Sequence, residues 1–273
     1  MPELGRKRSR RLVFASILLA STSLLFVFAQ ATHPAALVEV RTEDSALLPI
    51  PGAVLYNNVY GKNDIANYKQ SVFHGKDDTG WDWDWPESGG SVLKNYPEVL
   101  VGRSPWSDAG GPAGAAGLSA GDQLPRRLAE TRQTIDFDFS TVASGLWLGS
   151  FDFWITSSDR PTTKDIVSNL TIWTMNHGVK NTYKGRHMTL KIGGRTYEAI
   201  FETPKEQPDK PWKTLCLVDA EPRNKGSLEL GPLVEVLIAH GLAKPTDFLA
   251  TAELGSEVAY GKGRTTLRTF RLR

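Results

Sequence analysis

The feature that most limits the fold of this chain is a strict alternation of apolar and polar residues, clearest in residues 134–140 (TIDFDFS). Successive side chains of a β-strand point to opposite faces, so the pattern predicts strands with one buried face. The dipeptide Gly193-Gly194 predicts a hairpin turn between two such strands. The alternation recurs in residues 146–155, 167–174, 187–192, 196–202 and 212–218.

Further strands are predicted on both sides of this central run. They cover residues 53–60, 68–74, 91–102, 248–258 and 265–272, the third of them bent at Pro97. One helix is predicted over residues 228–240, because an apolar stripe recurs at helical spacing and Gly241 ends it. Many short strands and a single helix predict an all-β sandwich, most simply a jelly roll. Residues 103–127, rich in Gly, Ala and Pro, are predicted to be a long surface excursion.

The first 31 residues are predicted to be a signal peptide. A basic segment from Arg6 to Arg11 precedes an apolar run over residues 12–29, and Ala29-Gln30-Ala31 matches a cleavage site. An uncleaved membrane anchor is the alternative, because the run is near the minimum length for a transmembrane helix. Three polar residues inside the run and the cleavage site favour a cleaved signal, and therefore a secreted, extracytoplasmic protein. Residues 32–52 are expected to form a tether and residues 53–273 a single domain.

Composition excludes several classes of function. The net charge is +2, but residues 1–31 carry five Lys/Arg and one acid, so the remaining chain is slightly acidic. This balance argues against a nucleic-acid ligand and permits a neutral one. Five scattered histidines give no metal-binding spacing, and no phosphate loop or nucleophile elbow occurs, so no metal or cofactor is expected. The single cysteine, Cys216, lies in an apolar run and is predicted to be a buried thiol.

Two neighbouring strands between residues 149 and 175 carry the first candidate site. Alternation places Asp152 and Trp154 on one face of the first strand. Asn169, Thr171 and Trp173 share one face of the second. Indoles stack on sugar rings, and carboxylates and amides bind hydroxyls, so this surface is typical of a sugar-binding cleft. Core strands that carry a few polar residues are the alternative.

Two further motifs combine acids with aromatic or apolar strands. In residues 80–86 (GWDWDWP), three tryptophans share one strand face and two aspartates the other, which fits an aromatic core strand as well as a sugar-binding surface. In residues 253–257 (ELGSE), Glu253 and Glu257 share one face of an otherwise apolar strand. If they enter a cleft, desolvation would raise one carboxyl pKa enough to make a general acid. An exposed edge strand is the alternative.

In combination, these motifs resemble glycoside hydrolase family 12, the jelly-roll endo-β-1,4-glucanases and xyloglucanases. The resemblance covers about residues 53–273, with the motifs in family order. They are residues 56–61 (YNNVYG), 80–85 (GWDWDW), 94–98 (KNYPE), 151–155 (FDFWI), 169–173 (NLTIW), the helix at 228–240 and residues 253–257 (ELGSE). The resemblance implies two curved antiparallel sheets and a concave groove for β-1,4-linked glucan: cellulose, mixed-linkage glucan or xyloglucan. The protein is expected to be a monomer.

The resemblance implies catalytic roles as well. The family hydrolyses with retention, which needs two carboxyl groups about 5–5.5 Å apart. Its acid/base falls on Glu257, and the aspartate that supports the nucleophile falls on Asp152. The nucleophile position itself is Asn169, and an amide cannot form the glycosyl ester. Where the family motif has a methionine after the nucleophile, this chain has Thr171. The implied sugar contacts are Asn58, Tyr60 (usually Trp in the family), Trp83, Trp85, Glu98, Trp173 and Glu253.

Two functions therefore stay open. In the first, the protein is an endoglucanase-type hydrolase of low or altered activity, with Glu257 as acid/base and a larger role for Asp152. One form of this hypothesis is inverting hydrolysis, with Asp152 as general base on a water in the space left by Asn169. In the second, it is a non-catalytic glucan-binding protein that uses the same groove. Loss of the nucleophile favours the binder, whereas retention of both acids favours the hydrolase.

Overall fold

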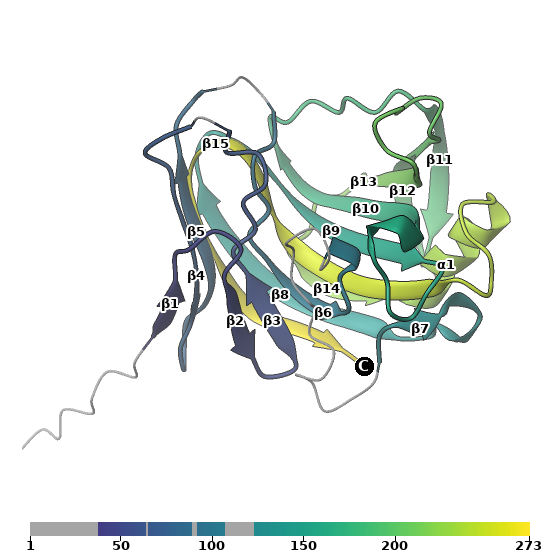
Figure 1. Ribbon diagram of the computed structural model, residues 1–273, viewed down its shortest axis with the longest axis horizontal. Coiled ribbons are helices and arrows are strands. Elements are labelled where there is room, and N and C mark those ends of the chain that lie inside the picture. Colours follow the sequence, from purple (N-terminus) through teal and green to yellow (C-terminus); the bar gives the residue numbers. More distant parts are fainter. Residues whose placement is uncertain (1–37, 64, 89–91, 107–122) are drawn as a thin grey trace, which may run out of the picture. The chain divides into compact units, whose positions relative to one another are not determined.

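The computed structural model describes residues 38–63, 65–88, 92–106 and 123–273, which fold mainly as β-sheet (Figure 1). Strands of two sheets, A and B, make up this architecture. Sheet A contains β1 (Glu39–Arg41), β4 (Lys69–His74), β5 (Thr79–Trp85), β8 (Thr134–Ala143) and β14 (Lys225–Glu229). Sheet B contains β2 (Leu47–Ile50), β3 (Ala53–Tyr56), β6 (Glu98–Gly102), β7 (Arg126–Arg127), β9 (Leu146–Thr156), β10 (Ile166–His177), β11 (Arg186–Ile192), β12 (Arg195–Glu202) and β13 (Lys213–Asp219). The prediction of an all-β sandwich with one short helix is confirmed.

The long strand β15 (Phe248–Leu272) belongs to both sheets. Its first half pairs with β6 and β9 in sheet B, and its second half pairs with β5 and β8 in sheet A (Figure 1). The sequence predicted two strands here, broken between residues 258 and 265. The ladder instead continues through Gly261, whose φ is +111° and where a Cβ would lie 2.1 Å from the Ser144 carbonyl oxygen. Glycine therefore lets the strand turn from one sheet into the other without interruption.

Alternation along the strands decides which side chains form the core. On β9 and β10 the residues Phe151, Phe153, Leu170 and Ile172 are buried in one cluster with the inward residues of sheet A. The intervening residues of β9 and β10 point to the opposite face of sheet B. Sheet B therefore has one face in the core and one face free to build a site.

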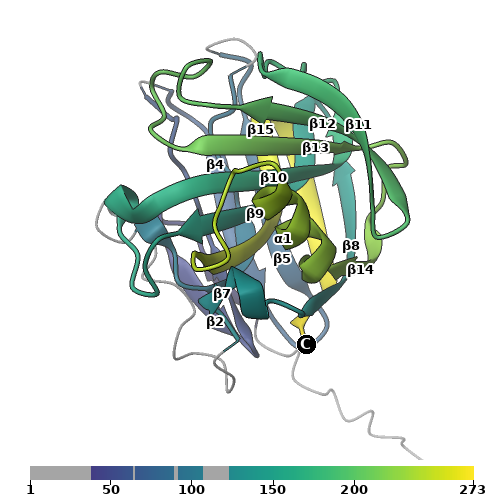
Figure 2. The same cartoon turned by 90° about the vertical axis from the view of Figure 1, so that its right-hand side faces the viewer.

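The pairing within sheet B differs from the prediction in one place. β10 and β13 run parallel, with Thr171 opposite Cys216, whereas the sequence predicted antiparallel sheets. After β10 the chain crosses to the sheet edge, forms the β11–β12 hairpin at Gly193-Gly194 and returns inward to β13 (Figure 2). β12 runs antiparallel to β11, and β13 runs antiparallel to β12, so β13 runs parallel to β10. Cys216 is a buried free thiol, as predicted.

The predicted helix begins two residues later than expected. Residues 225–229 form β14, which pairs with β8, and α1 (Leu230–Ala239) follows directly. The buried residues of α1, Leu230, Leu233, Val234 and Leu237, join the main core cluster. Two single-turn 3-10 helices, η2 (Leu128–Glu130) and η3 (Thr163–Asp165), complete the described elements.

The expected tether is partly wrong. β1 and β2 lie inside residues 32–52 and pair with β4 and β3, so the fold includes residues 39–50. Short apolar strands of three or four residues show too little alternation to be recognised from sequence. The predicted signal peptide and most of the predicted excursion lie outside the described residues. In the described part of the chain, no helix is long and apolar enough to cross a membrane.

Candidate active site

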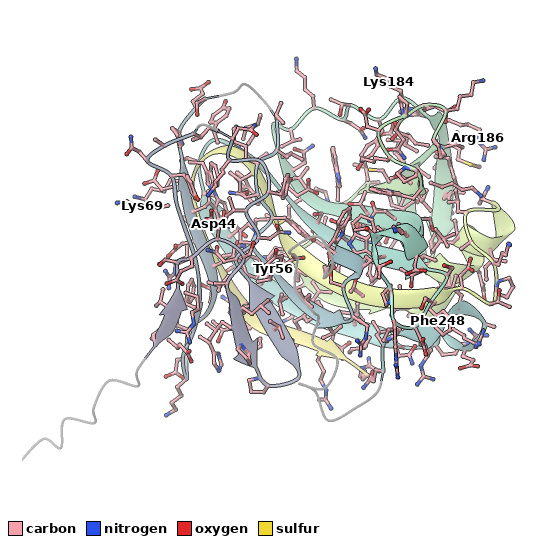
Figure 3. The ribbon with its side chains drawn as sticks, in the orientation of Figure 1. Asp44, Tyr56, Lys69, Lys184, Arg186 and Phe248 are labelled. Carbon is pink, nitrogen blue, oxygen red and sulfur yellow. The ribbon has the colours of Figure 1, made fainter. Side chains whose placement is uncertain are left out.

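A cleft of about 670 Å³ lies on the face of sheet B that turns away from the core. Side chains from β3, β6, β9, β10 and β15 and from connecting loops line the cleft. Tyr56 of β3, one of these side chains, is labelled in Figure 3. The lining residues are Ser45, Tyr56, Asn58, Val59, Tyr60, Tyr96, Glu98, Ser104, Trp106, Asp152, Trp154, Asn169, Thr171, Tyr183, Lys210, Trp212, Glu253 and Glu257. The cleft thus gathers four carboxyl groups beside several aromatic rings.

Strand register brings Asp152 to the centre of the floor. On β9 it stands opposite Thr171 of β10 on one side and opposite Glu253 of β15 on the other. Directly paired residues of adjacent strands share a face with Cβ atoms about 4.5–5.5 Å apart. Glu257 follows Glu253 by four residues on β15 and so faces the same cleft.

Asp152 and Asn169 are hydrogen-bonded neighbours. Asn169 Nδ2 donates to Asp152 Oδ1 at 3.2 Å, with a weaker contact of 3.5 Å to the Phe153 carbonyl oxygen. Burial raises the pKa of Asp152 to about 7, although the hydrogen bond from Asn169 and the positive charge of Lys210 lower it. Asp152 therefore changes its charge near neutral pH.

Glu257 has the environment of a general acid. Burial, followed by the charge of Asp152, raises its pKa to about 8, while a hydrogen bond from Ser150 lowers it. Ser150 Oγ donates to Glu257 Oε1 at 3.1 Å. Because the charge of Asp152 is itself a cause of the raised pKa of Glu257, an ionised Asp152 favours the protonated form of Glu257.

Glu98 and Glu253 form a second carboxyl pair in the cleft wall. Glu98 Oε1 accepts a hydrogen bond from Asn58 Nδ2 at 3.2 Å, while Glu98 Oε2 is buried beside Glu253. Burial and the charge of Glu253 raise the pKa of Glu98 well above its usual range, and burial raises the pKa of Glu253 to about 8. Two buried acids in contact share a proton, so this pair is uncharged or singly charged at neutral pH.

Tyr96 covers the floor between the two glutamates of β15. A Cβ on Gly255 would lie 2.6 Å from the Tyr96 ring, so only glycine lets this ring lie directly on the strand. The Tyr96 hydroxyl donates to the Ser150 carbonyl oxygen at 2.9 Å and also favours the charged form of Asp152. Close packing of the Tyr96 ring therefore explains why the ELGSE motif has a glycine at position 255.

Three tryptophans form one end of the cleft. Trp106, Trp154 and Trp212 meet edge to face, with ring centroids 5.2–5.8 Å apart. They come from the segment after β6, from β9 and from the segment before β13, and all three are half-buried. Lys210, two residues before Trp212, is the only Lys or Arg among the described residues that line the cleft. Partly exposed indoles beside hydroxyl-binding acids suit sugar rings.

The structure brings most of the predicted site residues together. Asn58, Tyr60, Glu98, Asp152, Asn169, Glu253 and Glu257 all line the cleft. Tyr60 is 56% exposed, which leaves its ring open to a ligand.

Three predicted sugar contacts lie elsewhere. Trp83 and Trp85 are each 2% exposed in the core between the sheets, where Trp85 stacks on Tyr68 at 4.2 Å. The core interpretation of the GWDWDW motif is therefore correct, because β5 turns its aspartates to solvent. Trp173 lies on the cleft face of β10 but is covered by Tyr183, with ring centroids 6.1 Å apart. Tyr183 lines the cleft in its place.

The sequence prediction missed several lining residues on loops. Trp106, Tyr183 and Lys210 lie in segments without strand periodicity, and Trp212 lies at the start of a predicted strand but was not included among the sugar contacts. Trp154 was recognised on the correct face but was not included among the sugar contacts. Isolated aromatic residues in Pro-rich loops, such as Trp212 after Pro211, were the available signal.

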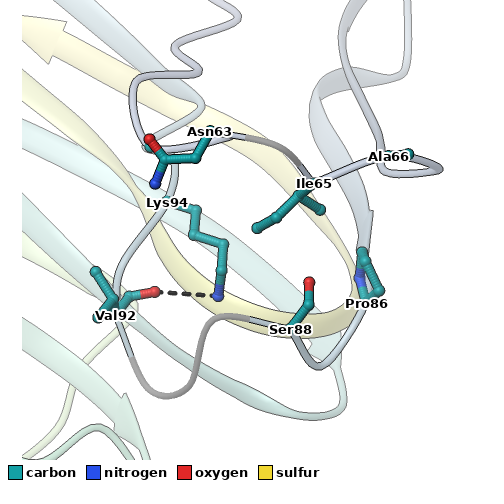
Figure 4. A pocket seen from close by; sticks show the side chains of 8 residues that line it. Asn63, Ile65, Ala66, Pro86, Ser88, Val92 and Lys94 are labelled. Carbon is teal, nitrogen blue, oxygen red and sulfur yellow. Dashed lines mark hydrogen bonds between the residues drawn. The ribbon is translucent and has the colours of Figure 1, made fainter.

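A second pocket, of about 550 Å³, lies apart from this cleft and is shown in Figure 4. Lys94 at its floor donates to the carbonyl oxygens of Val92, at 3.2 Å, and Ala259. None of the described residues that line this pocket carries a carboxyl group. Among the residues that the structure describes, no group of three or more His, Cys, Asp and Glu is arranged to hold a metal ion.

Comparison with known proteins gives a consistent result. No protein-family model matches the chain. It is 24% identical over 224 residues to Endoglucanase S of Pectobacterium parmentieri, covering 80% of each chain. Its fold is similar to a family 12 xyloglucanase from Bacillus licheniformis (TM-score 0.74, 21% identity, 86% of this chain and 99% of that one). It is also similar to an endoglucanase from Rhodothermus marinus (TM-score 0.68, 20% identity, 86% and 97%). The chain thus has the jelly-roll fold of these proteins and resembles cellulase-type glycoside hydrolases.

Proposed function

We propose that this protein is a family 12-type glycoside hydrolase that cleaves β-1,4-linked glucan in the cleft of sheet B. The observation that carries the proposal is the Glu257 carboxyl, which is held protonated near neutral pH inside an indole-lined cleft and is oriented by Ser150. A protonated acid beside a sugar-binding surface is what departure of a glycosidic oxygen requires. Similarity to an endoglucanase and to family 12 structures supports the same reaction class.

The binding mode follows from the cleft lining. The three indoles of Trp106, Trp154 and Trp212 offer apolar surfaces at one end, and Tyr60 offers a largely exposed ring. Neutral carboxyl groups and amides between them provide donors and acceptors for hydroxyl groups. An uncharged glucan fits this surface because the acids carry little net charge at neutral pH. We further propose that the protein is secreted after cleavage at residue 31 and acts as a monomer.

A non-catalytic glucan-binding protein is the second candidate, and Asn169 favours it. The amide stands where the resemblance implies a nucleophilic carboxylate, and it cannot form a covalent intermediate. Retention of Glu257 and Asp152 in the same cleft argues for the hydrolase.

Release of reducing ends from carboxymethyl-cellulose, barley β-glucan and xyloglucan tests the proposal. We expect wild-type protein to cleave at least one of them, and Glu257→Gln to lose about 10³-fold in rate because it removes the general acid. The matched control is Glu235→Gln, since Glu235 is exposed on α1 and outside the cleft. Glucan binding by both variants, measured by isothermal titration calorimetry, separates lost chemistry from lost structure.

Two results would favour the second candidate. One is a wild-type protein that binds glucan without cleaving it. The other is hydrolysis that appears only in Asn169→Glu, which would restore a carboxylate to the nucleophile position.

A further inference from the structure

The space around Asn169 differs from that of a retaining site in more than one residue. Asn169 is one methylene shorter than the glutamate implied by the resemblance, and its amide nitrogen is engaged by Asp152. No hydrogen bond to Asn169 Oδ1 comes from the described residues, so this oxygen remains an acceptor for a ligand. The family's Met two residues along is Thr171, which adds a hydroxyl where a thioether would stand.

Thr171 brings an unsatisfied polar atom to this space. Its side chain is 2% exposed and lines the cleft directly opposite Asp152 in the β9–β10 register. The Thr171 hydroxyl interacts with the Asp152 carboxyl and favours its charged form, and Thr171 Oγ1 has no other partner among the described residues. A buried hydroxyl that is incompletely hydrogen-bonded costs free energy, so a bound molecule that hydrogen-bonds to it would be stabilised.

The three groups together meet the requirements of a water site. A buried water needs two to four polar partners. Asp152, Asn169 and Thr171 line the same cleft, with Asn169 hydrogen-bonded to Asp152 and Thr171 opposite Asp152 in the strand register. The carboxylate accepts, the amide oxygen accepts and the hydroxyl can donate, which orients the water with one proton toward Asp152.

We propose that Asp152, Asn169 and Thr171 hold a nucleophilic water, and that this chain therefore hydrolyses glucan with inversion rather than retention. Asp152 is the general base, Glu257 is the general acid, and Asn169 and Thr171 position the water. This inference rests on the proposed glucan hydrolysis and specifies its mechanism.

The step balances without a covalent enzyme intermediate. The water oxygen forms a bond to the anomeric carbon while the bond to the leaving glycosidic oxygen breaks. Asp152 takes one proton of the water, and Glu257 gives its proton to the leaving oxygen. Exchange with solvent then returns Asp152 to the carboxylate and Glu257 to the acid. The charge of Asp152 raises the pKa of Glu257, so an ionised base beside a protonated acid is a favoured state of the pair.

The stereochemistry of the first product is the decisive measurement. Proton NMR of cellohexaose cleavage, recorded before mutarotation, should show new α-anomeric reducing ends with wild-type protein. New β-anomeric ends would overturn this mechanism while leaving glucan hydrolysis intact. Absence of any cleavage would overturn the proposed hydrolysis and this mechanism with it. Asn169→Glu should switch the product to the β-anomer, and α-product from that variant would contradict the assigned water position.

Thr171→Val tests the positioning role separately. The valine keeps the shape of threonine and removes the hydroxyl, so we expect kcat to fall about 10-fold with KM unchanged. Thr189→Val, an exposed site on β11, is the matched control and should change neither constant. A folded Thr171→Val protein with wild-type kcat would overturn the water site. Azide can replace the water without a base, so Asp152→Asn should regain activity toward an aryl β-cellobioside in azide and yield the α-glycosyl azide. An Asp152→Asn protein that azide leaves inactive would overturn the role of Asp152 as base.

Discussion

The two sheets carry aspartates in opposite electrostatic states. On the outward face of sheet A, Asp136 pairs with Arg273 at 2.5 Å, and Asp138 pairs with Lys225 at 2.9 Å. Hydrogen bonds from Arg273 and Ser227 lower the pKa of Asp136 to about 2. On the cleft face of sheet B, burial raises the pKa of Asp152 to about 7.

The difference between the two pKa values comes from the neighbours of each aspartate and not from its position in a strand. Both aspartates sit at polar positions of alternating strands, Asp136 on β8 and Asp152 on β9. The outer one meets the basic side chain of Arg273, which directly follows β15, whereas the inner one meets an amide, a tyrosine and other acids. A sequence alternation therefore places carboxyl groups on a face, but the environment of that face decides whether they are inert or reactive.

The pH dependence of hydrolysis gives the largest expected contrast. Asp152 must be ionised to act as base, so the rate should fall about 10-fold per pH unit below about 7. Glu257 must be protonated to act as acid, so the rate should fall similarly above about 8. Initial rates between pH 5 and 10 should give a bell with its maximum between these limits. A flat profile across pH 6–9 would contradict the raised pKa values.

Asp138→Asn on the outer face supplies the control for this profile. Because Asp138 is already ionised by its pairing with Lys225, the substitution should leave both limbs of the bell in place. A shifted limb in that variant would mean that long-range charge, and not the cleft environment, sets the profile.

Substitutions on the two faces should also differ in their effect on glucan affinity, by a smaller factor than the pH effect. Trp212→Ala removes one of the three indoles at the cleft end and should weaken binding about 10-fold, the effect of roughly 1.4 kcal/mol of stacking and burial. Val142→Asp on β8 changes an apolar side chain that is 82% exposed on sheet A and should not alter affinity. Calorimetric titration with cellohexaose measures both. Equal losses in the two variants would disprove that the cleft is the binding surface.

The free energy of unfolding should change with pH in opposite directions for a carboxyl group on each face. This is the smallest of the expected effects. Glu253 has a folded pKa of about 8, above its unfolded value, so its contribution is complete below about pH 4.5 and is lost as the pH rises toward 8. Asp136 has a lowered folded pKa, so its contribution is present above about pH 4 and is lost toward pH 2.

Glu253→Gln should therefore raise the melting temperature at pH 8, by about 2–4 °C if about 1 kcal/mol is recovered. Asp136→Asn should lower it slightly at the same pH. Differential scanning calorimetry at pH 5 and pH 8 checks both changes, and the gain from Glu253→Gln should shrink at pH 5. A gain that is as large at pH 5 would show that proton binding by Glu253 does not cause it.

Much of this site was predictable because its floor is built from regular strands. Asp152, Asn169, Glu253 and Glu257 each lie at a polar position in an apolar strand, and period-2 alternation is enough to assign them to faces. The resemblance to family 12 linked these strands before any pairing was known. The walls were not predictable in the same way, since Trp106 and Tyr183 reach the cleft from segments that have no periodicity.

Residue periodicity alone predicts most of the strands, the single helix, and which side chains of each predicted strand share a face. It could not decide which face of β5 is buried, because alternation is symmetric: three tryptophans on one side and two aspartates on the other fit a sugar platform as well as a core. The packing of sheet B against the indole face of β5 settles the question, because it buries Trp83 and Trp85 and leaves Asp82 to pair with Arg264. The same holds for the carboxyl groups of the cleft, whose raised pKa values come from burial among residues far apart in the chain.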